Sequence, residues 1–580
     1  MSNITVSGYL KTRLEQLGLD GLFCVAGNYA APFLDTILED ESCPIAIFGV
    51  SNEICAGYAA DGYARLKGIG CVVVTYGVGA FSLLNAVTGS LVENAPVVVV
   101  NGAPTNKEFQ NATYAGLLYS HMTSDPYSNL DVYQRITVNA ERITSAGQAP
   151  YQIDSVLTAC VTNGQPVYLE VLEDVWRALC DPPSSSLPRE QLSIATSSVL
   201  DAVAASIALI EAKGRPLFWA GVEIQRQRLQ QDFLDLIERT DFYFTTSLLG
   251  KSVVSEDHPR FVGVFAPTSP EHMKKLVGGA GCLIGLGAWT TGKDVNNENI
   301  LGDRVILAAR GGVFVGPRYF PSVMLRDYIQ ELLRALDKRP LRASAYAPAG
   351  YSPLAFAMAT ESSLTYDAFF NALNRWLTPD KVVISDAGFP LLGAQDLHIS
   401  AANGFVAQAA WLAIGYSTAA AIGVKCAVPE KRAVVVVGDG GFQETCQAVS
   451  SHKHLDQNTV VFVLANGIYG IEQKLVNPNP FRTPAHNYDR PLLNSTYSYN
   501  NLHDWNYETL TAAFGGEGRR VDTIDELRAV LSEIDSRPSE NFLIHVRVPS
   551  DDVPYALRPA LTAVGEDETL NPDWPPVLIF

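Results

Sequence analysis

The chain has 580 residues, too many for one hydrophobic core, so roughly two to four domains are expected. Hydrophobic residues make up 47% and charged residues 18% of the sequence, which is typical of a well-packed globular protein and excludes a disordered one. The net charge of −19, with no basic run, disfavours nucleic acids and anionic membrane surfaces as partners.

Nine cysteines occur, an odd number, and no two of them form a C-x-x-C pair. Most lie in apolar surroundings, which predicts reduced core thiols in a cytoplasmic protein. Residues 1–18 lack the charged-then-apolar pattern of a signal peptide, and no apolar run approaches the ~18 residues of a membrane span. We therefore expect an intracellular protein without a membrane partner.

The first third of the chain alternates between helix-like and strand-like segments. Apolar spacing predicts amphipathic helices over residues 6–18 and 31–40. Short or near-continuous apolar runs, typical of strands buried on both faces of a parallel sheet, occupy residues 22–27, 71–77, 95–104 and 166–172.

The alternation resumes twice, after linkers expected at residues 180–191 and 342–357. Further strands are expected at 215–221, 282–287, 304–309, 381–388, 433–441, 459–467 and 541–548. The predicted fold class is α/β, with three doubly wound parallel-sheet domains at residues 1–185, 192–341 and 355–580.

Two polar side chains follow apolar runs of the last third. Asp439 comes directly after one predicted strand and Asn466 after the next, with room for one helix between them. A right-handed crossover would bring both to one sheet edge, where they could supply oxygens to Mg²⁺. Gly440 and Gly441 would let the backbone approach a phosphate. The alternative is a tight strand–helix turn at Asp439 and an unrelated turn at Asn466. Either of these two sequence features, taken alone, is more often such a turn.

This Asp–Asn pattern resembles the thiamine diphosphate motif of the pyruvate decarboxylase superfamily. The resemblance covers essentially the whole chain, including "LFCVAGNY", "SNEICAGYAADGYAR" and "LANGIYGIEQ", and is strongest to pyruvate, indolepyruvate and phenylpyruvate decarboxylases. It implies pyrimidine-binding, central and diphosphate-binding domains, in that order. It also implies Mg²⁺ bound by Asp439, Asn466 and the carbonyl of Ile468, with Gly438, Gly440, Gly441 and Ile471 against the cofactor.

The resemblance assigns activation of the cofactor to Glu53, which matches the carboxylate beside the pyrimidine ring. An acid near the start of an Ala/Gly-rich helix with apolar neighbours is also typical of a mostly neutral proton donor. The alternative is a solvated first-turn Glu that interacts with the helix dipole.

Three further positions match cofactor contacts: Ile414 as the wedge under the folded cofactor, the Leu412 carbonyl as acceptor for the pyrimidine amino group, and Ser385 as a hydroxyl near the diphosphate. Because Glu53 and Asp439 lie in different domains, the resemblance implies a homodimer or homotetramer with the active site at a subunit interface.

The proton-transfer residues depart from the pattern of these decarboxylases. Their Asp, His-His pair and Glu correspond here to Asn28, to Ser120 and His121, and to Glu472, so one carboxylate and one imidazole are missing. Asn28 cannot act as a general acid near neutral pH, so protonation of the enamine (acyl-anion) intermediate would slow. The expected activity is decarboxylation of a 2-oxo acid. A dedicated carboligase that joins the same donor to an aldehyde or ketone acceptor is the alternative.

Other interpretations remain open at this stage. A catalytically silent relative could bind the cofactor as a structural module, although retention of Glu53, Asp439, Asn466 and Glu472 argues against it. His121 is as compatible with an ordinary loop residue as with a catalyst. The spacing of His452 and His454 resembles a metal-binding pair, but both are expected on a solvated helix face. The resemblance also implies that Leu475 lines the acyl pocket and that the central domain holds no flavin. Residues 551–580 could form a lid or pack on the surface.

Overall fold

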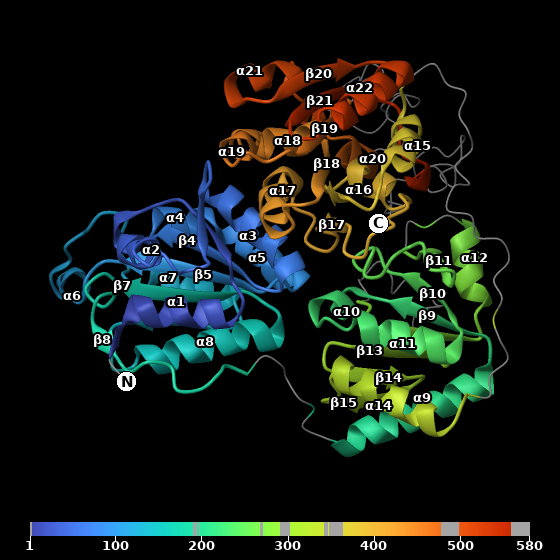
Figure 1. Cartoon of the computed structure of the whole chain (residues 1–580), viewed down its shortest axis with the longest axis horizontal. Coiled ribbons are helices and arrows are strands. Elements are labelled where there is room, and N and C mark those ends of the chain that lie inside the picture. Colours follow the sequence, from blue (N-terminus) through green and yellow to red (C-terminus); the bar gives the residue numbers. More distant parts are fainter. Residues whose placement is uncertain are drawn as a thin grey trace, which may run out of the picture.

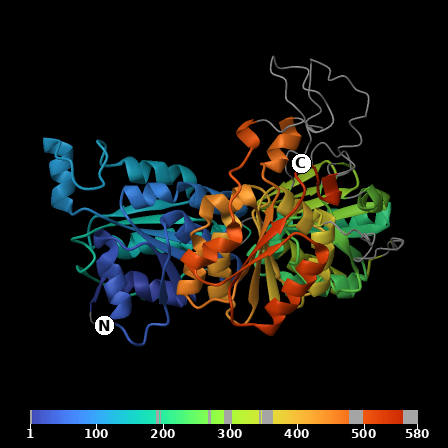
Figure 2. The same cartoon turned by 90° about the horizontal axis from the view of Figure 1, so that it is seen from above.

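The computed structural model describes residues 3–188, 193, 196–266, 269, 271–289, 302–341, 346, 364–476 and 498–557. Three α/β domains follow one another along the chain, as the sequence predicts (Figure 1). Figures 1 and 2 place the N-terminal domain at one end of the molecule, beside the C-terminal domain. The central domain adjoins the C-terminal domain (Figure 1).

The N-terminal domain is built on a parallel sheet in the order β3-β2-β4-β5-β7-β6. Its strands are β2 Gly21–Cys24, β3 Ala46–Gly49, β4 Gly70–Thr75, β5 Val97–Ala103, β6 Ala140–Ile143 and β7 Val167–Leu172, and a separate antiparallel pair joins β1 Ile4–Thr5 to β8 Leu179–Cys180. Its helices are α1 Val6–Gln16, α2 Ala31–Leu38, α3 Glu53–Lys67, α4 Val78–Ser82, α5 Leu84–Glu93, α6 Asn106–Ala115, α7 Ser128–Ile136 and α8 Ala149–Asn163, with a 3-10 turn at Asn28–Ala30.

The central domain has a mixed sheet in the order β11-β10-β9-β12-β13-β14-β15. Its strands are β9 Pro216–Ala220, β10 Tyr243–Thr246, β11 Phe261–Val264, β12 Cys282–Leu286, β13 Val305–Ala309, β14 Gly312–Val315 and β15 Arg318–Pro321. Its helices are α9 Thr196–Lys213, α10 Val222–Arg226, α11 Gln230–Thr240, α12 Glu271–Gly279 and α14 Leu325–Lys338. The last two strands are antiparallel and form one edge, a detail that the prediction of a parallel sheet did not include.

The C-terminal domain returns to a parallel sheet, in the order β17-β16-β18-β19-β21-β20. Its strands are β16 Lys381–Ser385, β17 Phe405–Ala407, β18 Arg432–Gly438, β19 Val460–Ala465, β20 Glu517–Val521 and β21 Phe542–Arg547. Its helices are α15 Tyr366–Trp376, α16 Phe389–Ala394, α17 Tyr416–Ala427, α18 Asp439–Thr445, α19 Ala448–His454, α20 Gly470–Val476, α21 Thr511–Phe514 and α22 Ile524–Ser536, with 3-10 turns at Ser498–Asn500, Tyr507–Leu510 and Tyr555–Leu557.

The N-terminal and C-terminal domains meet through two helices, α3 and α17, that are rich in Ala and Gly. A Cβ atom on Gly62 would lie 2.4 Å from the carbonyl oxygen of Ala420, and one on Gly423 would lie 1.8 Å from that of Ala59. The two backbones therefore approach more closely than larger residues would allow.

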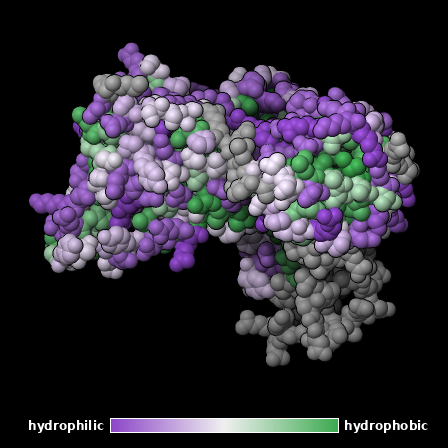
Figure 3. All heavy atoms as spheres, turned by 90° about the horizontal axis from the view of Figure 1, so that it is seen from below, coloured by the Kyte–Doolittle hydropathy of each residue, from purple (hydrophilic) through white to green (hydrophobic). Residues whose placement is uncertain are grey.

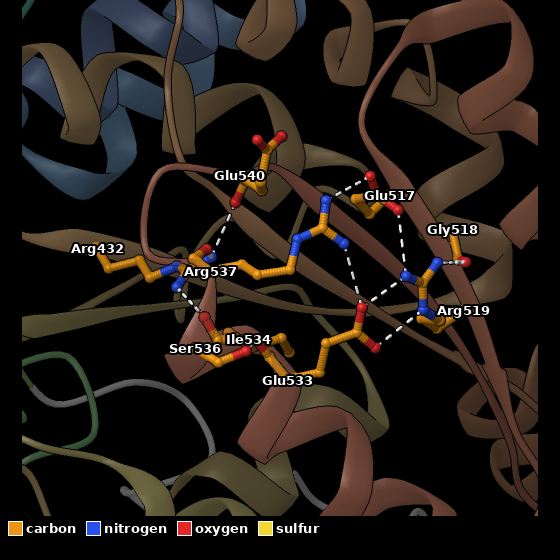
Figure 4. Close-up of polar contacts among 9 residues, drawn as sticks. All are labelled: Arg432, Glu517, Gly518, Arg519, Glu533, Ile534, Ser536, Arg537 and Glu540. Carbon is orange, nitrogen blue, oxygen red and sulfur yellow. Dashed lines mark hydrogen bonds and ion pairs between the residues drawn. The ribbon is translucent and has the colours of Figure 1, made fainter.

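An ion-pair network fastens the outer edge of the C-terminal sheet (Figure 4). Arg519 on β20 reaches Glu533 on α22 at 2.6 Å and Glu517 at 3.1 Å, and Arg537 reaches the same two carboxylates at 3.2 Å and 2.6 Å. Deeper in the domain, Arg432 donates to the carbonyl of Ile534 in the last turn of α22 at 2.7 Å and to that of Glu540 beyond the helix at 2.8 Å. These bonds hold a polar edge strand that has little apolar surface of its own.

Hydrophilic residues predominate on the face shown in Figure 3, with separate hydrophobic areas between them. In the described ranges no helix combines the length and apolar composition needed to cross a bilayer. All nine cysteines are free, and six of them are buried.

The close contact of α3 and α17 yields a stability prediction. Gly423→Ala should lower the free energy of unfolding by about 1–3 kcal/mol, because its methyl group would overlap the backbone of α3. Gly278→Ala is the matched control, since Gly278 is also helical but has no atom within 4 Å of its added Cβ. Urea unfolding measures both. Equal effects of the two substitutions would contradict the importance of this contact.

Candidate functional site

The carboxyl ends of β16, β18 and β19 lie side by side, because the three strands are parallel neighbours. Asp439 is the first residue of α18, directly after β18, and Asn466 directly follows β19. The backbone N–H of Gly467 donates to Asp439 Oδ2 at 2.7 Å. The structure therefore brings together the two predicted metal ligands.

Asp439 is 3% exposed, and no cationic side chain is among the described groups that shift its pKa. Burial raises the pKa of Asp439 to about 7, whereas the N–H groups of Gly467 and Gly440 act in the opposite direction. Gly440 donates to Oδ1 at 3.0 Å. A carboxylate buried without a counter-charge is the kind of group that a divalent cation stabilises.

Asn466 is oriented by its neighbours. Its Nδ2 donates to Tyr366 Oη at 3.1 Å, and its Oδ1 accepts from the N–H of Ile468 at 3.1 Å. Ile468 and Asn501 are paired in an isolated antiparallel bridge. On the side of Ile468, the hydrogen bonds of this bridge are made by the Tyr469 N–H and the Gly467 carbonyl, so the Ile468 carbonyl takes no part in it. Carboxylate, amide and carbonyl oxygens form a donor set that suits Mg²⁺, and the three predicted ligands fit that ion.

The glycines of this turn have packing roles as well as the predicted one. A Cβ on Gly440 would lie 2.4 Å from the Tyr469 ring, and one on Gly441 would lie 2.6 Å from Asp386 Oδ1. A Cβ on Gly438 would meet nothing closer than 3.8 Å. Bare backbone at the start of α18 therefore permits this packing.

Asp386 is a site residue that the sequence analysis did not identify. It follows Ser385 at the end of β16, is buried, and accepts from Gly415 N at 3.0 Å, Ser417 N at 2.9 Å and Ser417 Oγ at 2.7 Å. Burial raises its pKa to about 6, and these three donors oppose the increase. The signal was the same one that identified Asp439, an acid directly after a buried strand.

The N-terminal domain holds the other side of the loop that Asp386 supports, residues 408–415. Glu93 is fully buried, and its Oε1 accepts from Ala410 N at 2.7 Å and Trp411 N at 2.9 Å. Leu412 has a φ of 60°, in the left-handed region that Leu rarely adopts, so its flanking hydrogen bonds maintain this conformation.

Leu412 and Ile414 are 39% and 37% exposed on this clamped loop. The two residues predicted to contact the cofactor thus lie on an apolar surface that the single chain does not cover.

A buried polar cluster connects this loop to helix α3. Arg65 Nε lies 2.6 Å from Asp61 Oδ1, and Arg65 Nη1 donates to the Ala407 carbonyl at 2.7 Å and lies 3.8 Å from Glu93 Oε2. Tyr416, the first residue of α17, donates to Asp61 at 2.6 Å. Helix α3 begins at Glu53, so one network fixes both the helix of Glu53 and the loop of Ile414.

A second group of predicted residues lies at the carboxyl ends of β2 and β4 in the N-terminal domain. Glu53 Oε1 lies 3.5 Å from where a Cβ on Gly79 would be, and the His121 carbonyl lies against Gly77. Asn28 begins the turn after Gly27, which packs against Thr75 at the end of β4. Glu53 is half-buried, and Asn28 and His121 are exposed, as is Ser120 beside His121. The structure therefore gathers Asn28, Glu53 and His121 on one edge.

Helix α20 carries the remaining predicted residues. Ile471 is half-buried and packs over the turn after β16, 3.4 Å from the position of a Cβ on Gly388. Glu472 is exposed and Leu475 half-buried. The predicted C-terminal lid falls mainly on residues 558–580, which lie outside the described residues.

The prediction for His452 was wrong. Its side chain is 1% exposed, with Nδ1 2.6 Å from Gln457 Oε1 and Nε2 3.0 Å from the Thr418 carbonyl. His454, two residues later, is exposed as predicted. The polar sequence of α19 concealed an inward face that packs on α17.

Comparison with known proteins identifies all three domains. Residues 4–125 match the thiamine pyrophosphate enzyme N-terminal TPP binding domain, residues 203–336 the central domain, and residues 386–546 the C-terminal TPP binding domain.

Curated relatives align over nearly the full chain. An alpha-keto-acid decarboxylase of Mycobacterium tuberculosis is 29% identical over 559 residues, covering 95% of this chain and 96% of the relative. A protein of the same name from Mycobacterium leprae is 29% identical over 581 residues, covering 98% of each. Pyruvate decarboxylase 2 of Oryza sativa subsp. japonica is 26% identical over 530 residues, covering 88% of this chain and 82% of the relative.

Burial lowers the pKa of His452 below the ordinary value of 6.5, which yields a pH prediction. Stability that depends on the neutral imidazole is present above about pH 6.5 and is lost as the pH falls through the lower folded-state pKa. His452→Gln should therefore lose less unfolding free energy than the wild type between pH 7.5 and 5, measured by urea titration. His454→Gln, the matched exposed control, should follow the wild type. Parallel losses in all three proteins would contradict the prediction.

Proposed function

The chain belongs to the thiamine-diphosphate-dependent 2-oxo acid decarboxylase family, and from this premise we propose that it decarboxylates a 2-oxo acid with thiamine diphosphate and Mg²⁺. The observation that carries the proposal is the position of Asp439 beside Asn466 at the carboxyl edge of a parallel sheet, where Asp439 is buried and no described cation offsets its charge. The free and largely buried cysteines support a location in the reducing cytoplasm.

The proposed roles divide between the two sheet edges. Asp439, Asn466 and the Ile468 carbonyl would hold the cation, and the start of α18 with Ser385 and Ile471 would receive the diphosphate. Thiamine diphosphate, when bound, supplies the electron sink that decarboxylation requires. The Glu53 carboxyl group would exchange a proton with the pyrimidine ring, and Ile414 and the Leu412 carbonyl would orient that ring.

Asn28, Ser120 and His121 of the second group, together with Glu472 on α20, would act on the substrate. His121 and Glu472 would hold or move protons there, while Asn28 and Ser120 could donate only hydrogen bonds near neutral pH. The acyl side chain would lie near Leu475. The exposed residues at both edges suit binding of a small 2-oxo acid from solvent.

We further propose that a second copy of the chain completes the site, as a homodimer or a homotetramer. Leu412 and Ile414 expose apolar surface beside the diphosphate-binding residues. Val78, Leu117 and Leu118 do the same beside Glu53 and His121. Apolar surface next to both halves of the site is what association of two chains would cover.

Turnover of a panel of 2-oxo acids tests the proposal. With thiamine diphosphate and Mg²⁺, the protein should release CO₂ from at least one of pyruvate, branched-chain or aryl 2-oxo acids, and removal of Mg²⁺ by a chelator should abolish the activity. Glu53→Gln should lower kcat by roughly 10²–10⁴-fold, because a positioned proton donor is lost. Cofactor binding without turnover of any 2-oxo acid would instead support a silent binding module.

Asn28 makes carboligation a second candidate function, because a carboxamide cannot act as a general acid near neutral pH. With an acceptor aldehyde present, Asn28→Asp should shift the products from ligated ketol towards free aldehyde by about tenfold or more, resolved by mass spectrometry. Asn163→Asp, on an exposed position of α8, is the matched control. Free aldehyde as the sole product of the wild type would exclude the ligase.

A further inference from the structure

The segment between α6 and α7, residues 116–127, carries Ser120 and His121 on an otherwise exposed loop. Two of its residues, Met122 and Pro126, are buried. Leu118 is 71% exposed, and His121 has a φ of 66° with its carbonyl against Gly77. Little apolar packing holds this segment, so its conformation depends on a few specific contacts.

Arg142 on β6 contacts the C-terminal end of this segment and helix α6, which precedes it. Its Nη2 donates to the Pro126 carbonyl at 2.8 Å. Its guanidinium carbon lies 4.8 Å from the centroid of the Tyr127 ring and 4.4 Å from that of Phe109 on α6. One planar cation therefore stacks against the aromatic residues that flank the loop and bonds its backbone.

Glu170 on β7 orients this guanidinium. The two residues are register partners on adjacent parallel strands, and Arg142 Nε donates to Glu170 Oε1. Glu170 is fully buried, and its Oε2 accepts from Tyr168 Oη at 2.8 Å. Tyr168 stacks on Tyr133 of α7, with ring centroids 4.0 Å apart.

The burial of this pair bears on its role. Desolvation of two charges offsets much of their attraction, so a buried ion pair contributes little net stability. Instead, the ion pair fixes the orientation of the guanidinium, and with it the direction of its other N–H donors and of its two faces. Here these point at Pro126 and Tyr127, on the segment that carries His121, and at Phe109 on the preceding helix α6.

We propose that Arg142, oriented by Glu170, is a positioning residue that holds the 116–127 segment and thereby fixes His121 and Ser120 at the carboxyl edge of the N-terminal sheet. The effect on catalysis rests on the proposed function of His121. The effect on the segment itself does not, because it follows from contacts within the fold.

Hydrogen–deuterium exchange of the full chain tests the anchor without an activity assay. Arg142→Gln should increase exchange of the amides of residues 116–127 by about tenfold, with other peptides of the domain much less affected. Arg13→Gln is the matched control, because Arg13 is a buried cation of the same domain whose partners are Asp154, Tyr9, Gln16 and Ser185. If both variants loosen this segment equally, the proposal is overturned.

Two further variants separate anchoring from a folding defect. Tyr127→Ala removes only the half-exposed stacking partner and should also raise exchange in the segment. Arg142→Lys keeps the charge beside Glu170 but loses the planar fork, so it should restore overall stability without full protection of the segment. Wild-type protection in both variants would overturn the proposal.

Steady-state kinetics then tests the catalytic consequence. Arg142→Gln should lower kcat by about 10²-fold with a smaller change in KM, since misplacement of a reacting group by about 1 Å has that effect. A kcat equal to that of Arg13→Gln would overturn the positioning role. If the wild type turns over no 2-oxo acid, the proposed function fails, while the exchange experiment still decides whether Arg142 anchors the segment.

Discussion

The structure depends on the contact between α3 and α17 and on the charges buried beside it. Arg65 stands between two carboxylates, Asp61 and Glu93, that are removed from solvent. Without this guanidinium the two acids would repel each other in a region of low dielectric constant. With it they accept hydrogen bonds from Tyr416 and from the 408–415 loop, and so connect two domains that each hold half of the site.

The buried acids at the strand ends differ in how they are satisfied, and the difference explains their roles. Asp386 has three donors from the start of α17 and its preceding turn, so it acts within the protein as a support for the 408–415 loop. Asp439 accepts backbone N–H groups from its own turn and the next strand end, and no described cation offsets its charge. The same position in the fold therefore gives a structural acid in one case and, in the proposed function, a ligand for an external cation in the other.

Much of the fold was readable from the sequence because central parallel strands are continuous apolar runs, as in β18 and β19. Two of the strands that were not predicted, β6 and β20, lie at sheet edges and carry charged residues such as Arg142 and Arg519, which interrupt the apolar pattern. Asp439 and Asn466 could be identified because each follows a strand that was itself recognisable.

The supporting residues could not be identified in this way. Across a domain boundary, Glu93 meets the 408–415 loop and Arg65 meets Ala407 just before it, while Arg142 on β6 meets Pro126 in the segment before α7. Such contacts depend on tertiary packing, for which a local pattern carries no signal. For His452 the local pattern was misleading, because its polar sequence neighbours predicted an exposed side chain, whereas the side chain packs against α17.

The geometry of α3 has one more consequence. Gly62 lies nine residues after Glu53, so the contact with α17 and the carboxyl group are about 13 Å apart along the helix axis. If the helix tilted as a rigid body by about 5° about the glycine contact, its N-terminal end would move by about 1 Å. The position of the Glu53 carboxyl group, the proton donor of the proposed function, thus depends on a contact made by two glycines in the middle of the molecule.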